Sequence, residues 1–279
     1  MITFKDYHFY YKKDKPLFRQ FNFELDKGKV YGLFGENGSG KTTLLNAICG
    51  LNFPKKGALL VNNFKPKERR PQFLKDVFFV PDSIKLPKVK KNYFLAIYSV
   101  YYPNFSHADF NHYLKAFAIA DNEKPYELSF GQQKKFYLAF ALACNTSLIL
   151  MDEPTNGLDI PSKNQFRKIL ASFMNDEKTI IISTHQARDL EQVIDHILVL
   201  TKNELLVNQS VYEITDKVAF NFYSSKPVYM DHVVMCEETI GGYKVMEKNT
   251  EQVQTELDIE QLVNACFLAP DMIKKSLKN

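Results

Sequence analysis

One glycine-rich stretch constrains the fold of this chain more than any other. Residues 35–42 read Gly-Glu-Asn-Gly-Ser-Gly-Lys-Thr, which fits the phosphate-loop pattern G-x-x-x-x-G-K-[ST] at every fixed position. An apolar run that begins at Val30 precedes the loop, and helix-forming residues 43–48 follow it. A buried strand, a glycine loop and a helix in this order predict an α/β unit that binds a nucleoside triphosphate.

The residue types of this loop suit a chain of phosphates. Glycine reaches backbone angles that other residues avoid, so successive N–H groups can turn inward around an anion. The helix that follows directs the positive end of its dipole to the same point. The pattern places Lys41 on the β- and γ-phosphates and the Thr42 hydroxyl on Mg²⁺, whereas a plain glycine turn has no need of either. The residues expected to bind the nucleotide here are Gly35, Glu36, Asn37, Gly38, Ser39, Gly40, Lys41, Thr42 and Thr43.

Composition and charge narrow the class of protein. The 279 residues are 45% hydrophobic and 24% charged, which is ordinary for a globular chain with one large domain, or a main domain and a small one. A net charge of +4 is too small to indicate nucleic-acid binding. The four cysteines share no CxxC spacing, so neither a zinc site nor a disulfide framework is indicated, and a reducing cytosol is expected. No signal peptide or membrane span is predicted, so a membrane role requires a separate partner.

Two further apolar runs end in polar residues, the first in two acidic residues and the second in a histidine. Residues 147–151 run into Asp152 and Glu153, and adjacent carboxylates at the end of a buried strand cost free energy unless they are used. We expect Asp152 to hold Mg²⁺ directly or through water, and Glu153 to polarise the attacking water. Residues 178–184 end at His185. Because ligands gather at the carboxyl ends of parallel strands, His185 is expected near the γ-phosphate.

Two other features have a functional and a simpler interpretation. Tyr11 lies near the end of a predicted strand over residues 2–11, where its ring could stack on a purine or could be an ordinary half-buried tyrosine. Ser129 is a natural N-cap for a helix that includes residues 136–143. With Gly131 it could also form a second phosphate contact. From the residues alone, the simpler interpretation is favoured for both.

The remaining pattern predicts an elaborated α/β architecture. An antiparallel β section precedes the loop, with a hairpin-type turn at residues 26–28. Residues 83–126 resemble a small helical insertion around Pro103. We predict a main domain over residues 1–208, with a helical subdomain at about 83–145, and a small α+β accessory region over 209–279. Further strands are predicted at residues 58–61, 76–81, 194–200, 205–207, 218–223, 233–236 and 243–246, and a closing helix at 257–267.

Five motifs in order resemble those of the ATP-binding subunits of ABC transporters, and the resemblance covers about residues 1–207. The motifs are GENGSGKTT at 35–43, LSFGQ at 128–132, LILMDEP at 148–154, NGLD at 156–159 and STH ending at His185. The resemblance implies a P-loop NTPase core, with a mostly parallel sheet and helices on both faces, together with the antiparallel β section and the helical insertion of that family. It also implies ATP and Mg²⁺ as cofactors and ATP hydrolysis as the activity.

The resemblance implies roles for individual residues. In that family the signature helix contacts the γ-phosphate of ATP held by the opposite subunit, which assigns Ser129, Gly131 and Gln132 to contacts across a dimer. Glu153 resembles the catalytic base and His185 the switch histidine, beside the catalytic Lys41. Residues 156–159 resemble the loop that links the two sites, with Asp159 at the nucleotide. Tyr11 resembles the aromatic residue that stacks on adenine, with Tyr10 as the alternative.

The sequence departs from the family pattern at two positions. Phe130 replaces the second glycine of the signature, but Gly131 is retained and function is expected to survive. Asp82 stands where the family usually has glutamine, a residue that reaches Mg²⁺ and couples nucleotide state to the helical subdomain. Aspartate is a suitable hard ligand for Mg²⁺, although it is shorter than glutamine and charged.

The resemblance implies a peripheral protein on the cytoplasmic face of the membrane. Its expected partners are a second ATPase subunit, in a homodimer or heterodimer, and an integral-membrane permease. A loose likeness of the C-terminal region to exporter-type subunits favours export. Two alternatives stay open: a soluble ABC-type ATPase that acts on nucleic acid or the ribosome, and a nucleotide-dependent regulator with poor turnover. The short interval between residues 43 and 128, without heptads, and the presence of one ATPase unit disfavour the soluble ATPase.

Overall fold

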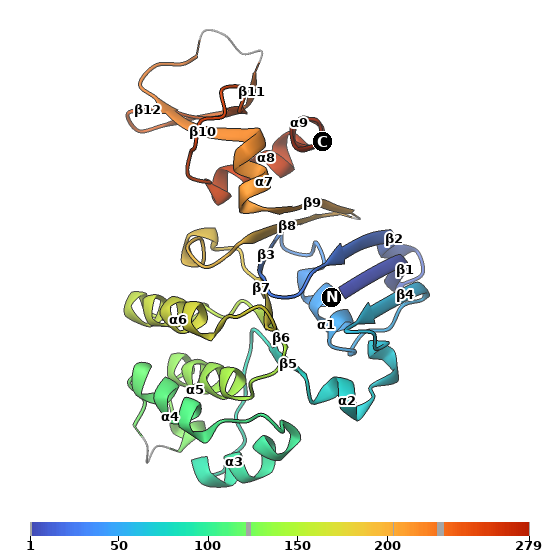
Figure 1. Cartoon of the computed structure of the whole chain (residues 1–279), viewed down its shortest axis with the longest axis vertical. Helices are drawn as coiled ribbons and strands as arrows, with labels where there is room; N and C mark the ends of the chain where they lie inside the picture. The colour runs from blue at the N-terminus through green and yellow to red at the C-terminus, as the bar shows by residue number, and fades with distance from the viewer. Residues whose placement is uncertain (1, 121–123, 203, 228–231, 279) are drawn as a thin grey trace.

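A six-stranded sheet forms the central layer of the molecule (Figure 1). The computed structural model describes residues 2–120, 124–202, 204–227 and 232–278. The strand order is β5-β6-β7-β3-β8-β9, in which β9 alone is antiparallel to its neighbour in this sheet. Their bounds are β3 (Val30–Phe34), β5 (Val77–Val80), β6 (Leu148–Asp152), β7 (Thr179–Ser183), β8 (His196–Thr201) and β9 (Glu204–Ser210).

Two hydrophobic cores lie on opposite faces of this sheet. Side chains alternate across a strand, so in β6 Ile149 and Met151 join one core while Leu148 and Leu150 join the other. The first core includes α5 (Phe130–Ala143) and α6 (Ile160–Phe173), and the second includes α1 (Lys41–Ile48). Burial on both faces explains why these strands read as continuous apolar runs rather than as alternating ones.

A separate antiparallel sheet covers α1. It has the order β2-β1-β4, with β1 (Ile2–Lys12), β2 (Lys15–Leu25) and β4 (Lys56–Val61). The hairpin-type turn predicted at residues 26–28 is wrong, because β2 and β3 belong to different sheets. The segment instead carries the chain from one layer to the next, and Gly28 takes a positive φ of 78° there.

Helices beyond β5 form the predicted insertion. Within its bounds of 83–126 lie α3 (Lys91–Tyr98) and α4 (His107–Ala116), while the long α5 follows it and the short α2 (Pro71–Leu74) precedes β5. Pro103 lies between α3 and α4, as expected, and residues 121–123 of the insertion fall outside the described residues. In Figure 1 these helices occupy the lower end of the molecule. No predicted element corresponds to α6, which follows the 156–159 loop.

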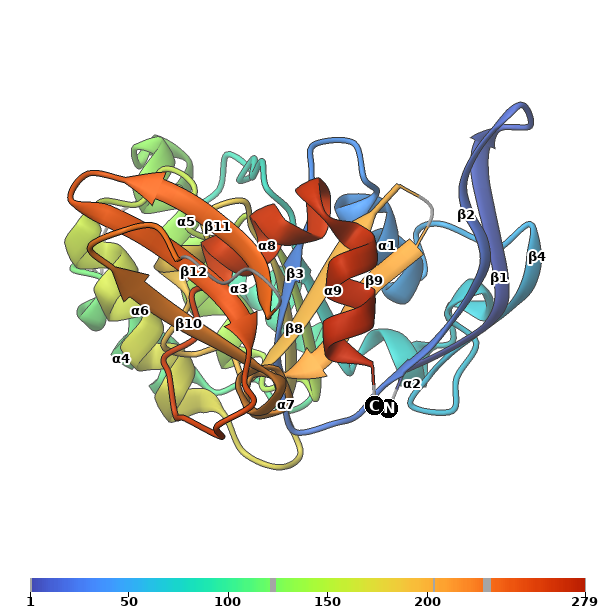
Figure 2. The same cartoon turned by 90° about the horizontal axis from the view of Figure 1, so that it is seen from above.

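The C-terminal region packs on the β8–β9 edge of the central sheet (Figures 1 and 2). Its sheet has the order β10-β12-β11, with β10 (Val218–Tyr223), β11 (Val233–Thr239) and β12 (Gly242–Lys248). Three helices accompany it: α7 (Val211–Lys217), α8 (Ile259–Leu268) and α9 (Pro270–Leu277). The predicted division at residue 208 falls within β9. Among the described residues no helix combines the length and the apolarity needed to cross a bilayer.

Taken together, these layers confirm the predicted fold class. A mostly parallel sheet has helices on both faces, and an antiparallel β section and a helical insertion extend it. Parallel strands bring their carboxyl ends to one edge, where the loops after β3, β6 and β7 meet. The residues of that edge form the candidate active site.

Candidate active site

The loop between β3 and α1 has the form of a phosphate-binding loop. Gly40, the residue before α1, has a φ of 108°, which is open to glycine and strained for other residues. Lys41 is 8% exposed, and its ammonium donates to the carbonyls of Gly35 at 2.7 Å and Glu36 at 3.2 Å. Burial lowers the pKa of Lys41, and the carboxylates of Glu153 and Asp152 oppose that shift.

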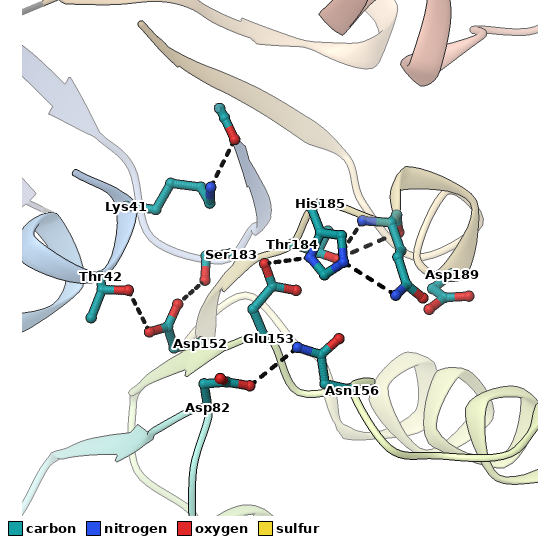
Figure 3. A network of polar contacts seen from close by, with 12 residues as sticks. Lys41, Thr42, Asp82, Asp152, Glu153, Asn156, Ser183, Thr184, His185 and Asp189 are labelled. Carbon is teal, nitrogen blue, oxygen red and sulfur yellow. Dashed lines mark hydrogen bonds and ion pairs between the residues drawn. The ribbon is translucent and has the colours of Figure 1, made fainter. Parts of the chain in front are cut away.

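A short chain of hydrogen bonds joins this loop to the ends of β6 and β7 (Figure 3). The Thr42 hydroxyl donates to Asp152 Oδ2 at 2.6 Å, and the Ser183 hydroxyl donates to Asp152 Oδ1. Asp152 is 5% exposed, so both carboxylate oxygens are fixed in a buried position. Ser183 was not among the predicted site residues, although it ends β7 and stands two positions before His185 in the sequence.

Glu153 and His185 face each other at the same edge. Glu153 Oε1 lies 2.9 Å from His185 Nδ1, and His185 Nε2 lies 3.3 Å from the amide nitrogen of Gln186. The amide nitrogen can only donate, so Nε2 accepts and Nδ1 carries the proton toward Glu153. The second oxygen of Glu153, Oε2, is buried and has no hydrogen-bond partner among the described residues. An unpaired buried oxygen of this kind is suited to accept a bond from a water molecule.

The Asp82 side chain lies below Asp152 and Glu153 in Figure 3 and points toward Asn156. Its Oδ1 accepts from the Asn156 amide at 3.1 Å and lies 3.7 Å from the Lys134 ammonium. Lys134 is 1% exposed and donates to the main-chain oxygens of Asp82 and Glu153. The sequence analysis did not single out Lys134. The signal for it was a lysine one helical turn before Leu138, on the apolar face of the helix.

The signature residues begin α5. Ser129 and Gln132 form a reciprocal capping box, in which each side chain accepts from the other residue's backbone N–H. The Phe130 ring is 55% exposed and lies against Gly157 of the following motif. Asp159 in that motif caps α6 through a 2.9 Å bond from the Ser162 N–H, and its bonds from Ser162 lower the pKa of the Asp159 carboxyl.

Tyr11, rather than Tyr10, reaches the phosphate-loop helix. Its hydroxyl lies 3.1 Å from the Thr43 hydroxyl and accepts from Asn52 at 3.3 Å. Its ring stands edge-on to Phe9 and is 68% exposed, so one aromatic surface is open beside the loop. The Tyr10 ring instead lies 5.6 Å from the Lys55 ammonium.

The residues at the loop fit a Mg²⁺ ion that also binds substrate phosphate. Thr42 and Asp152 offer hard oxygen ligands that already lie 2.6 Å apart. Within the part of the chain that the structure describes, no group of three or more His, Cys, Asp or Glu residues is placed to hold a metal by itself. Mg²⁺ suits such a site, because it commonly takes one or two protein ligands and completes its shell with phosphate and water.

Fold and site together define a P-loop ATPase, and comparisons with known proteins specify which kind. The family model described as ABC transporter matches residues 18–156. The ABC transporter ATP-binding protein NatA of Bacillus subtilis (strain 168) is 31% identical over 215 residues, which are 72% of this chain and 86% of the relative.

Solved structures agree in fold. The structure of an ATP-binding subunit of an ABC transporter has a TM-score of 0.68 and 21% identity, over 77% of this chain and 91% of that chain. A dimeric ATP-binding cassette in a post-hydrolysis state, bound to ADP and Pi, has a TM-score of 0.65 and 23% identity, over 75% of this chain and 98% of that chain.

The chain therefore belongs to the ATP-binding subunits of ABC transporters. It binds and hydrolyses ATP as the energy-supplying subunit of a transporter, which confirms the predicted family, activity and transport role. Subunits of this family dimerise and pair with membrane permeases.

Proposed function

We propose that Glu153 is the base of an ATP hydrolysis reaction that takes place between the phosphate loop and the ends of β6 and β7. The observation that carries this proposal is the free Oε2 of Glu153, which is buried at the same edge as the Thr42–Asp152 pair. Oε1 is held by His185, so Oε2 remains to take the proton of an attacking water. Catalysis then rests on positioning and on stabilisation of charge at the transferring phosphoryl group.

The other predicted residues each bind a different part of MgATP. Lys41 exchanges its two loop carbonyls for the β- and γ-phosphates, and the N–H groups of residues 35–43 surround the phosphate chain. Tyr11 offers its open ring to adenine. Thr42 and Asp152 hold Mg²⁺, which neutralises phosphate charge when bound. We keep Asp82 as a weaker candidate ligand, because its carboxylate already bonds Asn156.

We further propose that two copies of the chain close around two ATP molecules. The signature residues Ser129, Gly131 and Gln132 begin a capped helix, and the N–H groups at such a helix end suit a phosphate. Each signature would contact the γ-phosphate held by the other copy, and residues 156–159 would join the two sites. His185 is half-exposed beside Glu153, so it can reach the same phosphate.

A permease docking site is proposed at the helical insertion. A cavity of about 760 Å³ lies between the β5 region and the residues around Pro103, and its lining is mainly apolar. Val100 and Tyr101 line it while remaining 70% and 65% exposed. Export, which the resemblance favours, stays a prediction.

Charge placed in this cavity should weaken permease capture. Val100→Asp or Tyr101→Asp should reduce the amount of membrane protein that copurifies with tagged protein held in MgATP, because an unpaired charge is poorly accommodated in an apolar contact. Val253→Asp, at an exposed position of the C-terminal region, is the matched control. Equal capture by all three variants would contradict docking at this cavity.

The central test replaces Glu153 with glutamine. Glu153→Gln should bind ATP with nearly unchanged affinity, whereas kcat should fall by about 10²- to 10⁴-fold, the usual contribution of a general base. Steady-state phosphate release and nucleotide-binding titrations measure the two quantities. Vigorous turnover by this variant would remove Glu153 from the role of base.

A further inference from the structure

Lys134 is a buried cation for which the mechanism above has no role. It lies in the second turn of α5, one turn beyond the signature residues, and is 1% exposed. Its ammonium donates to the Asp82 carbonyl at 2.7 Å and to the Glu153 carbonyl at 2.9 Å. A charge taken out of water is costly unless its surroundings compensate for it, so this position demands an explanation.

The charges around Lys134 are those of the candidate active site. Burial lowers the pKa of the ammonium, while Asp82, Asp152 and Glu153 act in the opposite direction. The Asp82 carboxylate is the nearest of them, at 3.7 Å. The ammonium therefore lies beside the acidic edge of the site, and the shortest contacts that it makes are its hydrogen bonds to the two main-chain oxygens.

The main chain at Glu153 needs this support. Glu153 has a φ of 48°, in the left-handed region that is strained for a residue other than glycine. Its N–H donates to the Ser183 carbonyl at 3.0 Å, and its carbonyl accepts from Lys134. Both sides of the residue are thus fixed, one by β7 and the other by α5. The direction of the Glu153 side chain toward His185 follows from that backbone geometry.

We infer that Lys134 is a positioning residue that fixes the Glu153 backbone and couples it to the signature helix. The inference rests on the proposed role of Glu153 as base. Because Lys134 and the signature belong to one helix, a shift of α5 on contact with the other subunit's ATP would move the Asp82 and Glu153 carbonyls with it. The presence of ATP on the other subunit would then set the position of Glu153 in the site of this subunit.

The test separates positioning from folding. Lys134→Met keeps the length of the side chain but removes the donors, and it should leave ATP affinity nearly unchanged. It should lower kcat by about 10- to 100-fold, as expected when a catalytic group is misplaced by about 1 Å. Dependence of the rate on ATP concentration should also become less cooperative. Lys134→Gln, which keeps two N–H donors, should recover part of the lost kcat.

Lys178→Met is the matched control. Lys178 is also a partly buried lysine with a lowered pKa, but it bonds Asn145 and lies over the Phe173 ring, outside the site. Rates are to be compared below the unfolding temperature of each variant, with the folded fraction measured by circular dichroism. A loss of stability with unchanged kcat for Lys134→Met would reduce Lys134 to a structural role and overturn the inference.

The same assays distinguish this inference from the proposed function. Normal turnover by Lys134→Met beside a stalled Glu153→Gln would overturn the Lys134 assignment alone. Equal turnover by wild type and Glu153→Gln would overturn the role of the base, and with it the positioning role inferred for Lys134.

Discussion

At the level of single residues, the contact between Phe130 and Gly157 accounts for one departure from the family pattern. A Cβ atom on Gly157 would lie 2.6 Å from the Phe130 ring, and Gly157 has a φ of 78°. A Cβ on Gly131 would in turn lie 2.6 Å from the Gly157 carbonyl. The bulky Phe130 is thus accommodated because the neighbouring loop has glycine at position 157, and the start of α5 packs directly on that loop.

This contact predicts a non-additive pair of substitutions. Gly157→Ala should destabilise the protein by about 1–2 kcal/mol from the left-handed backbone alone, with a further cost from the clash with the Phe130 ring. Phe130→Ala removes the ring, so the double variant should be more stable than the sum of the single effects by about 0.5–3 kcal/mol. Urea unfolding of the four proteins measures the cycle. Additive values would show that the ring and Gly157 do not compete for space.

At the level of elements, the sequence predicts those parts of the site that depend on local patterns. The phosphate loop, the strands that end at Asp152 and Ser183 and the capped start of α5 follow from glycine spacing, apolar runs and a Ser129 cap, all of which are local. The hairpin at residues 26–28 fails because nothing local distinguishes a turn within a sheet from a connection between two sheets. Phe166, Ile169, Leu170 and Phe173 are buried at helical spacing in α6, a pattern that is readable from sequence.

Contacts between residues far apart in the chain could not be predicted from the sequence. Lys134 reaches Asp82 and Glu153 across 52 and 19 positions, and no periodicity encodes such pairings. The hydrogen bond that Asp82 accepts from Asn156 could not be predicted either, because the two residues lie 74 positions apart in the chain. Both sets of contacts depend on the packing of α5 against the sheet. That packing determines which polar groups are buried and therefore need hydrogen-bond partners within the protein.

At the scale of the whole molecule, the C-terminal region shares its core with the ATPase part. Ile259 and Leu262 of α8 are buried in the same cluster as Ile197 and Val199 of β8. Arg188, three residues after His185, forms an ion pair with Glu260 at 2.8 Å. The predicted accessory region therefore lies against the segment that follows His185, the residue proposed to reach the γ-phosphate, and movement of one is expected to involve the other.

The whole-molecule claim tested most directly is that two copies of the chain enclose ATP between them. Sedimentation velocity of Glu153→Gln, with and without MgATP, measures this. We predict a monomer without nucleotide and a dimer with it, because the glutamine variant binds ATP but cannot release the closed state by hydrolysis. Adding Lys41→Ala to the same chain should abolish the dimer. A protein that hydrolyses ATP as wild type, yet remains monomeric as Glu153→Gln at saturating MgATP, would contradict the account.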